Sequence, residues 1–159
     1  MTAPAQTQQA TPHKLGISPV FSQASNKCSS VPGIKTQGEI EAAVCEKIAH
    51  FEQEYMGRGP KDIHAHLIGD ILMVRLRGVL TAAEQKLANT HPSDKGRGLL
   101  KQMRIQLMET ARPTLEETVQ NITGVEVISL HYDISTTTGE EVILFTLAEA
   151  PVFREAKRG

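Results

Sequence analysis

A tight turn between two short alternating segments constrains this chain more than any other feature of the sequence. Gly69-Asp70 separates two runs, 62–68 and 71–77, in which apolar and polar residues alternate. A Gly-Asp pair between such runs is typical of a two-residue hairpin turn, which fixes the residues that face each other across the strands. The sequence therefore predicts a β-hairpin with one apolar face, made of Ile63, Ala65, Leu67, Leu72, Val74 and Leu76.

The opposite side of this hairpin is polar and carries the main candidate site. The register places His64 across from Arg75 and Asp62 across from Arg77, with His66 on the same side. We expect Asp62 and Arg77 to form a cross-strand ion pair. His64, His66, Arg75 and Arg77 together predict a surface for an anion or an acidic partner, and an ordinary solvated sheet face is the alternative.

A second hairpin is predicted near the end of the chain. Its turn spans residues 135–140 and includes Gly139, which can adopt a positive φ at little cost. The apolar face of its two strands is expected to contain Ile128, Leu130, Tyr132, Ile134, Ile143, Phe145 and Leu147.

Three helices are predicted from apolar residues at three- and four-residue steps. Thr36 with Glu39, and Thr81 with Glu84, fit the capping box, in which each side chain satisfies the other residue's free backbone N–H. A short helix follows Thr81, and a long helix follows residues 91–93 and contains Pro113, where we expect a kink or a restart. The first helix carries the stripe Ile40, Val44, Ile48, Phe51 and Tyr55.

These elements predict an α+β fold for residues 36–150. Two hairpins and two substantial helices favour a two-layer sandwich, in which a four-stranded, mainly antiparallel sheet carries the helices on one face. Residues 1–35 hold four prolines and no acidic residue, so we expect a disordered N-terminal tail, with an organellar transit peptide as the alternative. Residues 151–159 form a short C-terminal tail.

The charge distribution disfavours nucleic acid as a partner. The tail carries +3 and the whole chain −1, so residues 36–159 carry −4, whereas strong nucleic-acid binders concentrate basic charge. A local basic cluster of Lys95, Arg97, Lys101 and Arg104 keeps this alternative open, and Arg97 and Arg104 join the candidate partner surface. The longest apolar run, 142–148, is too short to span a membrane.

Catalysis and metal binding are alternatives rather than predictions. His64, His66, His131 and Asp133 would suit a metal-binding protein or small enzyme if the hairpins adjoined, although Arg75 would repel a cation there. Ser129 shares a strand side with His131 and Asp133, yet no GxSxG elbow marks a nucleophile. We therefore expect a non-enzymatic protein without a cofactor.

Several separated motifs resemble one bacterial family. They are Gly57-Arg58-Gly59-Pro60, Arg75-Leu76-Arg77-Gly78-Val79-Leu80-Thr81, Arg112-Pro113, Ile122-Thr123-Gly124-Val125, Asp133-Ile134 and Thr138-Gly139-Glu140. This pattern resembles the MpsC-like family, named after the C component of a sodium-translocating membrane-potential-generating system. The resemblance implies a cytoplasmic accessory or regulatory subunit with a protein partner, in a membrane complex for cation or inorganic-carbon uptake. The edges of a small sheet also favour a homodimer.

Overall fold

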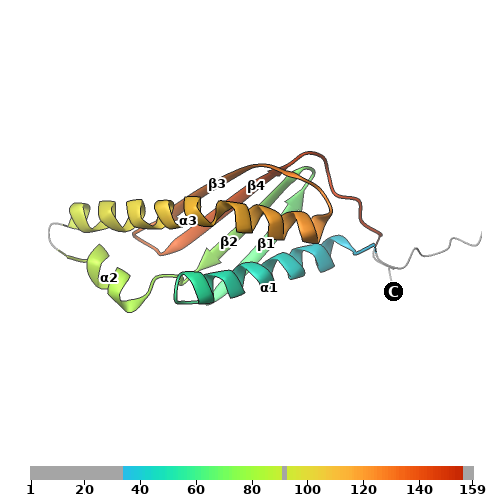
Figure 1. The fold of residues 1–159 in the computed structure, drawn as a ribbon. Coiled ribbons are helices and arrows are strands. Elements are labelled where there is room, and N and C mark those ends of the chain that lie inside the picture. The colour runs from blue at the N-terminus through green and yellow to red at the C-terminus, as the bar shows by residue number, and fades with distance from the viewer. Residues whose placement is uncertain (1–33, 91–92, 156–159) are drawn as a thin grey trace, which may run out of the picture. The chain divides into compact units, whose positions relative to one another are not determined.

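The structure is a computed structural model that describes residues 34–90 and 93–155 (Figure 1). The predicted N-terminal tail and residues 156–159 lie outside the described residues. The elements are, in order, α1 (Gln37–Tyr55), β1 (Asp62–Ile68), β2 (Ile71–Arg77), α2 (Ala82–Ala88), α3 (Ser93–Thr123), β3 (Val127–Ser135) and β4 (Glu140–Leu147).

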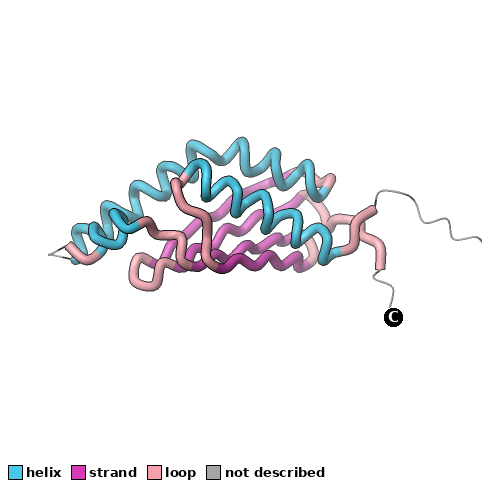
Figure 2. The backbone as a smooth tube through the Cα atoms, turned by 90° about the horizontal axis from the view of Figure 1, so that it is seen from below, coloured by secondary structure: helices cyan, strands magenta, loops and turns pink. Residues whose placement is uncertain are grey.

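The four strands form one sheet in the order β1-β2-β4-β3, and every neighbouring pair is antiparallel. The two hairpins therefore join through β2 and β4, which leaves β1 and β3 at opposite edges. Helices α1 and α3 pack on one face of this sheet, and the opposite face lies away from them (Figure 2). The predicted α+β sandwich is confirmed.

The register of the first hairpin is the one that Gly69-Asp70 predicts. His64 lies across from Arg75, Ala65 across from Val74, and Leu67 across from Leu72. Gly69 has a φ of 62°, a left-handed conformation in which a side chain would be strained. The six predicted apolar side chains therefore all face the helices.

The second hairpin matches its prediction except at Ile128. Gly139 has a φ of 67° in the connecting turn, and Leu130 and Ile134 are buried as expected. The pairing shifts between Val127 and Ser129, so Ile128 is the extra residue of a bulge and is 60% exposed. The prediction that Ile128 faces the core was wrong, because strict alternation assumes an unbroken ladder.

Both predicted capping boxes are present at the starts of α1 and α2. Helix α3 runs through Pro113 without interruption, so of the predicted kink or restart the restart does not occur. Its buried side chains continue on both sides of the proline, and this tertiary packing holds the helix together where a backbone bond is lost. The α3 residues in the core are Leu100, Met108, Ala111, Leu115 and Val119.

Candidate functional site

The sheet face opposite the helices, called the outer face below, brings together the four residues predicted on the first hairpin. His64, His66, Arg75 and Arg77 all occupy outward positions of β1 and β2. The side chain of Arg75 is 39% exposed and that of Arg77 is 52% exposed. The register thus places them where the sequence predicted.

The two arginines of the outer face share one carboxylate. Arg75 Nη2 donates a hydrogen bond to Glu140 Oε2 at 2.6 Å, and Arg77 Nε donates to the same oxygen at 3.2 Å. These hydrogen bonds hold the pKa of the Glu140 carboxyl below its usual range. The predicted Asp62–Arg77 ion pair was wrong, because Glu140 faces Arg77 from the other side while Asp62 Oδ1 lies 3.1 Å from His64 Nε2.

The histidines of the outer face fall into two separate groups. The rings of His64 and His66 stack with centroids 6.4 Å apart, whereas His131 lies on β3 at the other edge of the sheet. Three strand spacings, roughly 14 Å, separate the two edges. His131 and Asp133 therefore cannot complete a metal site with His64 and His66, and residues 34–90 and 93–155 contain no group of three metal-ligating side chains suited to an ion.

The middle of the outer face is apolar. Met73, Val142 and Leu144 are half-buried neighbours on the central strands, and Ile71 is 37% exposed beside them. Charged and polar side chains flank this centre, including the Arg75–Arg77–Glu140 group. An apolar centre with a polar rim is the usual composition of a protein–protein interface.

The second predicted surface, on the long helix, does not exist as predicted. Arg104 is fully buried, and Arg97 is half-buried with an Nε that meets no partner among the described residues. Lys101 Nζ lies 2.7 Å from Asp133 Oδ1 on β3. The prediction that Lys95, Arg97, Lys101 and Arg104 form one continuous basic surface was wrong, because Arg104 points toward the sheet together with the apolar stripe of α3.

Arg104 instead forms a buried ion cluster with three glutamates. Its Nε donates to Glu84 Oε1 at 2.8 Å, and its Nη1 donates to Glu141 Oε2 at 2.7 Å. Glu52 Oε2 lies 3.6 Å from the same Nη1, and Nη2 donates to the backbone oxygen of Val79 at 3.2 Å. Glu52 and Glu141 are fully buried. One guanidinium therefore serves three carboxyl groups from α1, α2 and β4.

Burial and charge give the members of this cluster different pKa values. Burial raises the pKa of Glu52 to about 7 against the opposing charge of Arg104. Burial, with the charge of Glu52, raises the pKa of Glu141 well above its usual range. Burial also acts to raise the pKa of Glu84, but hydrogen bonds from Arg104 and Thr81 outweigh it and leave that pKa lowered.

Tyr132 completes the surroundings of the cluster from β3. Burial, and then the charge of Glu141, raises the pKa of its phenol above the usual range. Its hydroxyl is buried and meets no hydrogen-bond partner within residues 34–90 and 93–155. Hydrophobic patterning assigned Tyr132 to the core but gave no role to its hydroxyl.

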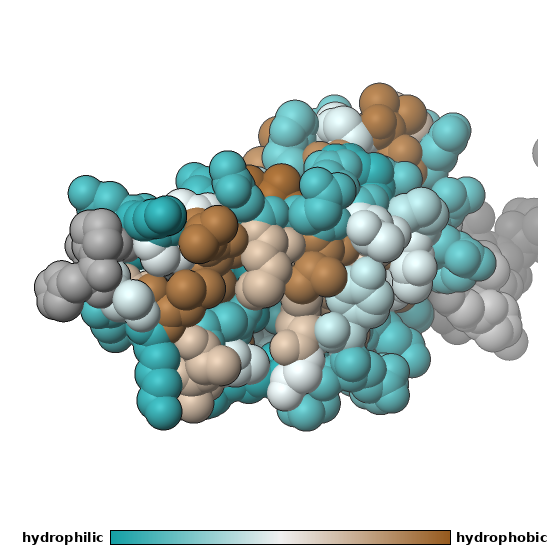
Figure 3. Space-filling view, turned by 60° about the vertical axis from the view of Figure 1, so that its left-hand side comes forward, coloured by the Kyte–Doolittle hydropathy of each residue, from teal (hydrophilic) through white to brown (hydrophobic). Residues whose placement is uncertain are grey.

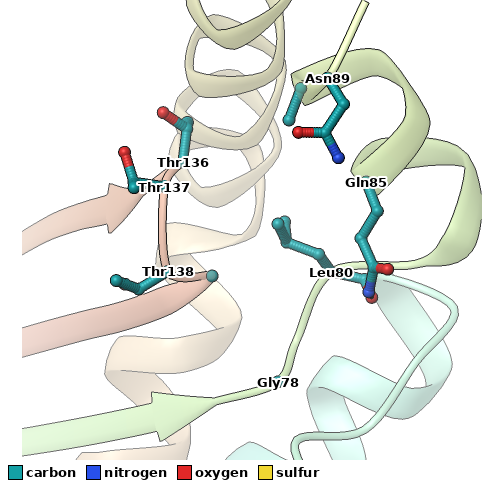
Figure 4. A pocket seen from close by; sticks show the side chains of 9 residues that line it. Gly78, Leu80, Gln85, Asn89, Thr136, Thr137 and Thr138 are labelled. Carbon is teal, nitrogen blue, oxygen red and sulfur yellow. The ribbon is translucent and has the colours of Figure 1, made fainter.

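The described residues also line two hollows. One, of about 210 Å³, lies between α2 and the β3–β4 turn, with Gln85 and Asn89 on one side and residues 136–138 on the other (Figure 4). The other, of about 450 Å³, lies between α1 and α3 and is lined by Phe51, Glu54, Tyr55, Thr110, Ala111 and Thr114. Neither gathers a set of catalytic side chains.

Apolar side chains also reach solvent on the helical side. Figure 3 shows brown residues among teal ones at the end of the molecule where α2 and α3 meet. The exposed apolar residues of α3 are Leu99, Met103 and Ile105. Leu99 and Met103 lie one turn apart on the same side of α3, whereas Ile105 points to another side of the helix.

Comparison with known families matches residues 36–149, the whole of the sheet and its helices, to the family described as Na+-translocating membrane potential-generating system (MpsC). The chain belongs to this family. The uncharacterized protein YbcI of Bacillus subtilis (strain 168) is 35% identical over 113 residues, which cover 71% of this chain and 89% of that protein. No solved structure matches. Among the residues that the structure describes, no helix is long and apolar enough to cross a membrane.

Proposed function

We propose that this protein is a non-enzymatic accessory subunit that binds a protein component of a sodium-translocating membrane system through its outer face. The description of the family names a Na+-translocating membrane system, and this supports a component of such a system as the partner. The observation that carries the proposal is the composition of the outer face, where half-buried Met73, Val142 and Leu144 form an apolar centre opposite the helices. We place this binding in the cytoplasm and on a cation or inorganic-carbon uptake complex.

The charges around the apolar centre favour a protein partner over an inorganic anion. Glu140 accepts hydrogen bonds from both Arg75 and Arg77, so it neutralises one of the two positive charges. Asp62 and Asp133 add negative charge beside His64 and Lys101. A mixed rim of this kind contributes specificity and register to a protein interface, whereas an anion site needs unpaired cationic donors.

Two isoleucines offer a matched test of this docking surface. Ile71 on the outer face and Ile105 on α3 are both 37% exposed, so Ile71→Glu and Ile105→Glu introduce the same charge at equal exposure on different sides of the domain. The tagged full-length chain and both variants would be used for affinity capture from gently solubilised membranes and from soluble extract. Circular dichroism would first establish that each variant folds.

We expect the wild type and Ile105→Glu to retain an integral subunit of a cation or inorganic-carbon uptake system. Ile71→Glu should lose most of it, because a charge beside the apolar centre of the interface would be desolvated without a partner. Equal recovery of the subunit by the two variants would show that the docking surface does not include the outer face around Ile71. A wild-type chain that retains only further copies of itself would make the outer face a homodimer interface and overturn the membrane assignment.

A further inference from the structure

The buried cluster around Arg104 contains more negative charge than positive. Glu52, Glu84 and Glu141 are the titratable acids that face this guanidinium, from α1, α2 and β4, and Tyr132 faces it from β3. With every carboxyl ionised, the cluster would carry a net charge of −2, and of its four members only Glu84, at 12% exposure, reaches solvent. Such an excess is strongly unfavourable unless a proton or another cation balances it.

The hydrogen bonds of the cluster are distributed unevenly among the three acids. Glu84 accepts from Arg104 Nε and also from the Thr81 backbone N–H, so its charge is well compensated. Glu141 accepts from Nη1 through Oε2, but its Oε1 meets no partner within residues 34–90 and 93–155. Neither oxygen of Glu52 accepts a hydrogen bond in the same described part. The unsatisfied oxygens thus belong to Glu52 and Glu141.

These two carboxyl groups approach the same nitrogen atom. Glu141 Oε2 lies 2.7 Å and Glu52 Oε2 lies 3.6 Å from Arg104 Nη1, which brings them near each other in the sheet–helix interface. Two buried carboxyl groups at one site ionise in coupled steps, and the first proton to leave is lost more easily than the second. A proton on one of them removes the repulsion and supplies the donor that the pair lacks.

We propose that Glu52 and Glu141 hold a shared proton in the folded protein, and that its release on raising the pH loosens the C-terminal half of α1. Glu52 lies one turn from the end of α1, whereas Arg104 lies inside the long helix α3 and Glu141 in a central strand. Of the two glutamates that share the proton, Glu52 therefore lies on the element that can move more easily, near a helix end rather than in a central strand. The hollow of about 450 Å³ beside Phe51 and Tyr55 leaves room for that turn to move.

The pH dependence of unfolding tests the shared proton. Because the pKa of Glu52 is raised from 4.5 to about 7, the folded chain binds more protons than the unfolded chain between these values. Stability is then fully present below about pH 4.5 and is lost as the pH rises through about 7. For each extra proton, the unfolding constant should rise by up to tenfold per pH unit.

The full-length wild type, Glu52→Gln and the control Glu46→Gln would be unfolded in urea at pH 5, 6, 7 and 8. Glu46 is an exposed acid on the same helix, so Glu46→Gln should keep the wild-type slope. Glu52→Gln should flatten the slope and lose less stability at pH 8 than the wild type does. Identical slopes for Glu52→Gln and the wild type would overturn the proposal.

Two measurements remain decisive if Glu52→Gln fails to fold. Carbon-13 NMR of the wild-type glutamate carboxyls should show a buried group that titrates near pH 7, and ordinary midpoints for all glutamates would refute the shared proton. Hydrogen-exchange protection in residues 49–55, corrected for the intrinsic rate, should fall from pH 6 to pH 8 more than in residues 40–44. An equal change in both segments would refute the movement of α1.

Discussion

Glu140 and Glu141 are consecutive residues of β4, yet they belong to opposite kinds of charge cluster. Glu140 faces outward and receives hydrogen bonds from Arg75 and Arg77, so two cations share one acid near solvent. Glu141 faces the helices and shares Arg104 with Glu52 and Glu84, so three acids share one buried cation. The same side-chain types therefore have different consequences on the two faces of one sheet.

The difference follows from where water can reach. On the outer face, solvent screens the charges, and each pair contributes little to stability while remaining available to a partner. Inside the domain, the charges have lost most of their hydration, and removal of Arg104 would leave the acids without a compensating cation. We therefore assign a structural role to the Arg104 cluster and a binding role to the outer face.

The largest expected effect compares the same substitution at two adjacent residues of β2 that point to opposite faces of the sheet. Leu72→Asp should unfold the domain, with a loss of more than about 4 kcal/mol, because it buries an unpaired charge in the core. Ile71→Asp changes the neighbouring residue on the exposed side and should leave a folded protein. Circular dichroism with urea unfolding checks both, and a folded Leu72→Asp beside an unfolded Ile71→Asp would mean that the hairpin register is wrong.

The next effect compares the two arginine environments. Arg104→Met removes the only cation of the buried cluster and should cost about 3–5 kcal/mol at pH 7. The loss should be larger at pH 8 than at pH 5, because protonation relieves the carboxyl groups that remain. Arg75→Met is the matched control and should cost several-fold less. Similar losses of unfolding free energy for the two variants would contradict the division into structural and surface charges.

A smaller effect separates the two neighbouring glutamates by the sign of their pH dependence. The lowered pKa of Glu140 contributes stability that is present above about pH 4.5 and is lost as the pH falls. The raised pKa of Glu141 contributes stability at low pH that is lost as the pH rises. Unfolding free energy should therefore depend less steeply on pH below about 4.5 in Glu140→Gln. In Glu141→Gln it should depend less steeply on pH near neutrality. Changes in the same pH range would contradict the assignment.

Much of the fold could be predicted because local signals and the global arrangement agree. Gly69-Asp70 gave the register of one hairpin, Gly139 the turn of the other, and Thr36 and Thr81 the starts of two helices. The order of the strands could not be predicted, because hairpin patterns do not say which strands of two hairpins pair. The strand order places His64 and His131 at opposite edges of the sheet, so their separation could not be predicted either.

The buried cluster left a signal in the sequence, but its meaning depended on tertiary packing. Glu52 continues the four-residue spacing of Ile40, Val44 and Ile48, and Arg104 follows Leu100 at the same spacing. A charge at a core position predicts a buried partner. The identity of the partners could not follow, since they lie on separate helices and strands that only the folded chain brings together.

The most direct test of the central claim is site-specific photo-crosslinking in cells from two methionines. Benzoylphenylalanine would replace Met73, at the centre of the outer face, or Met103, which is 41% exposed on α3. We predict that position 73 crosslinks to a subunit of a cation or inorganic-carbon uptake complex and that position 103 does not. Crosslinks to that subunit from position 103 alone would contradict the assignment of the outer face as the binding surface.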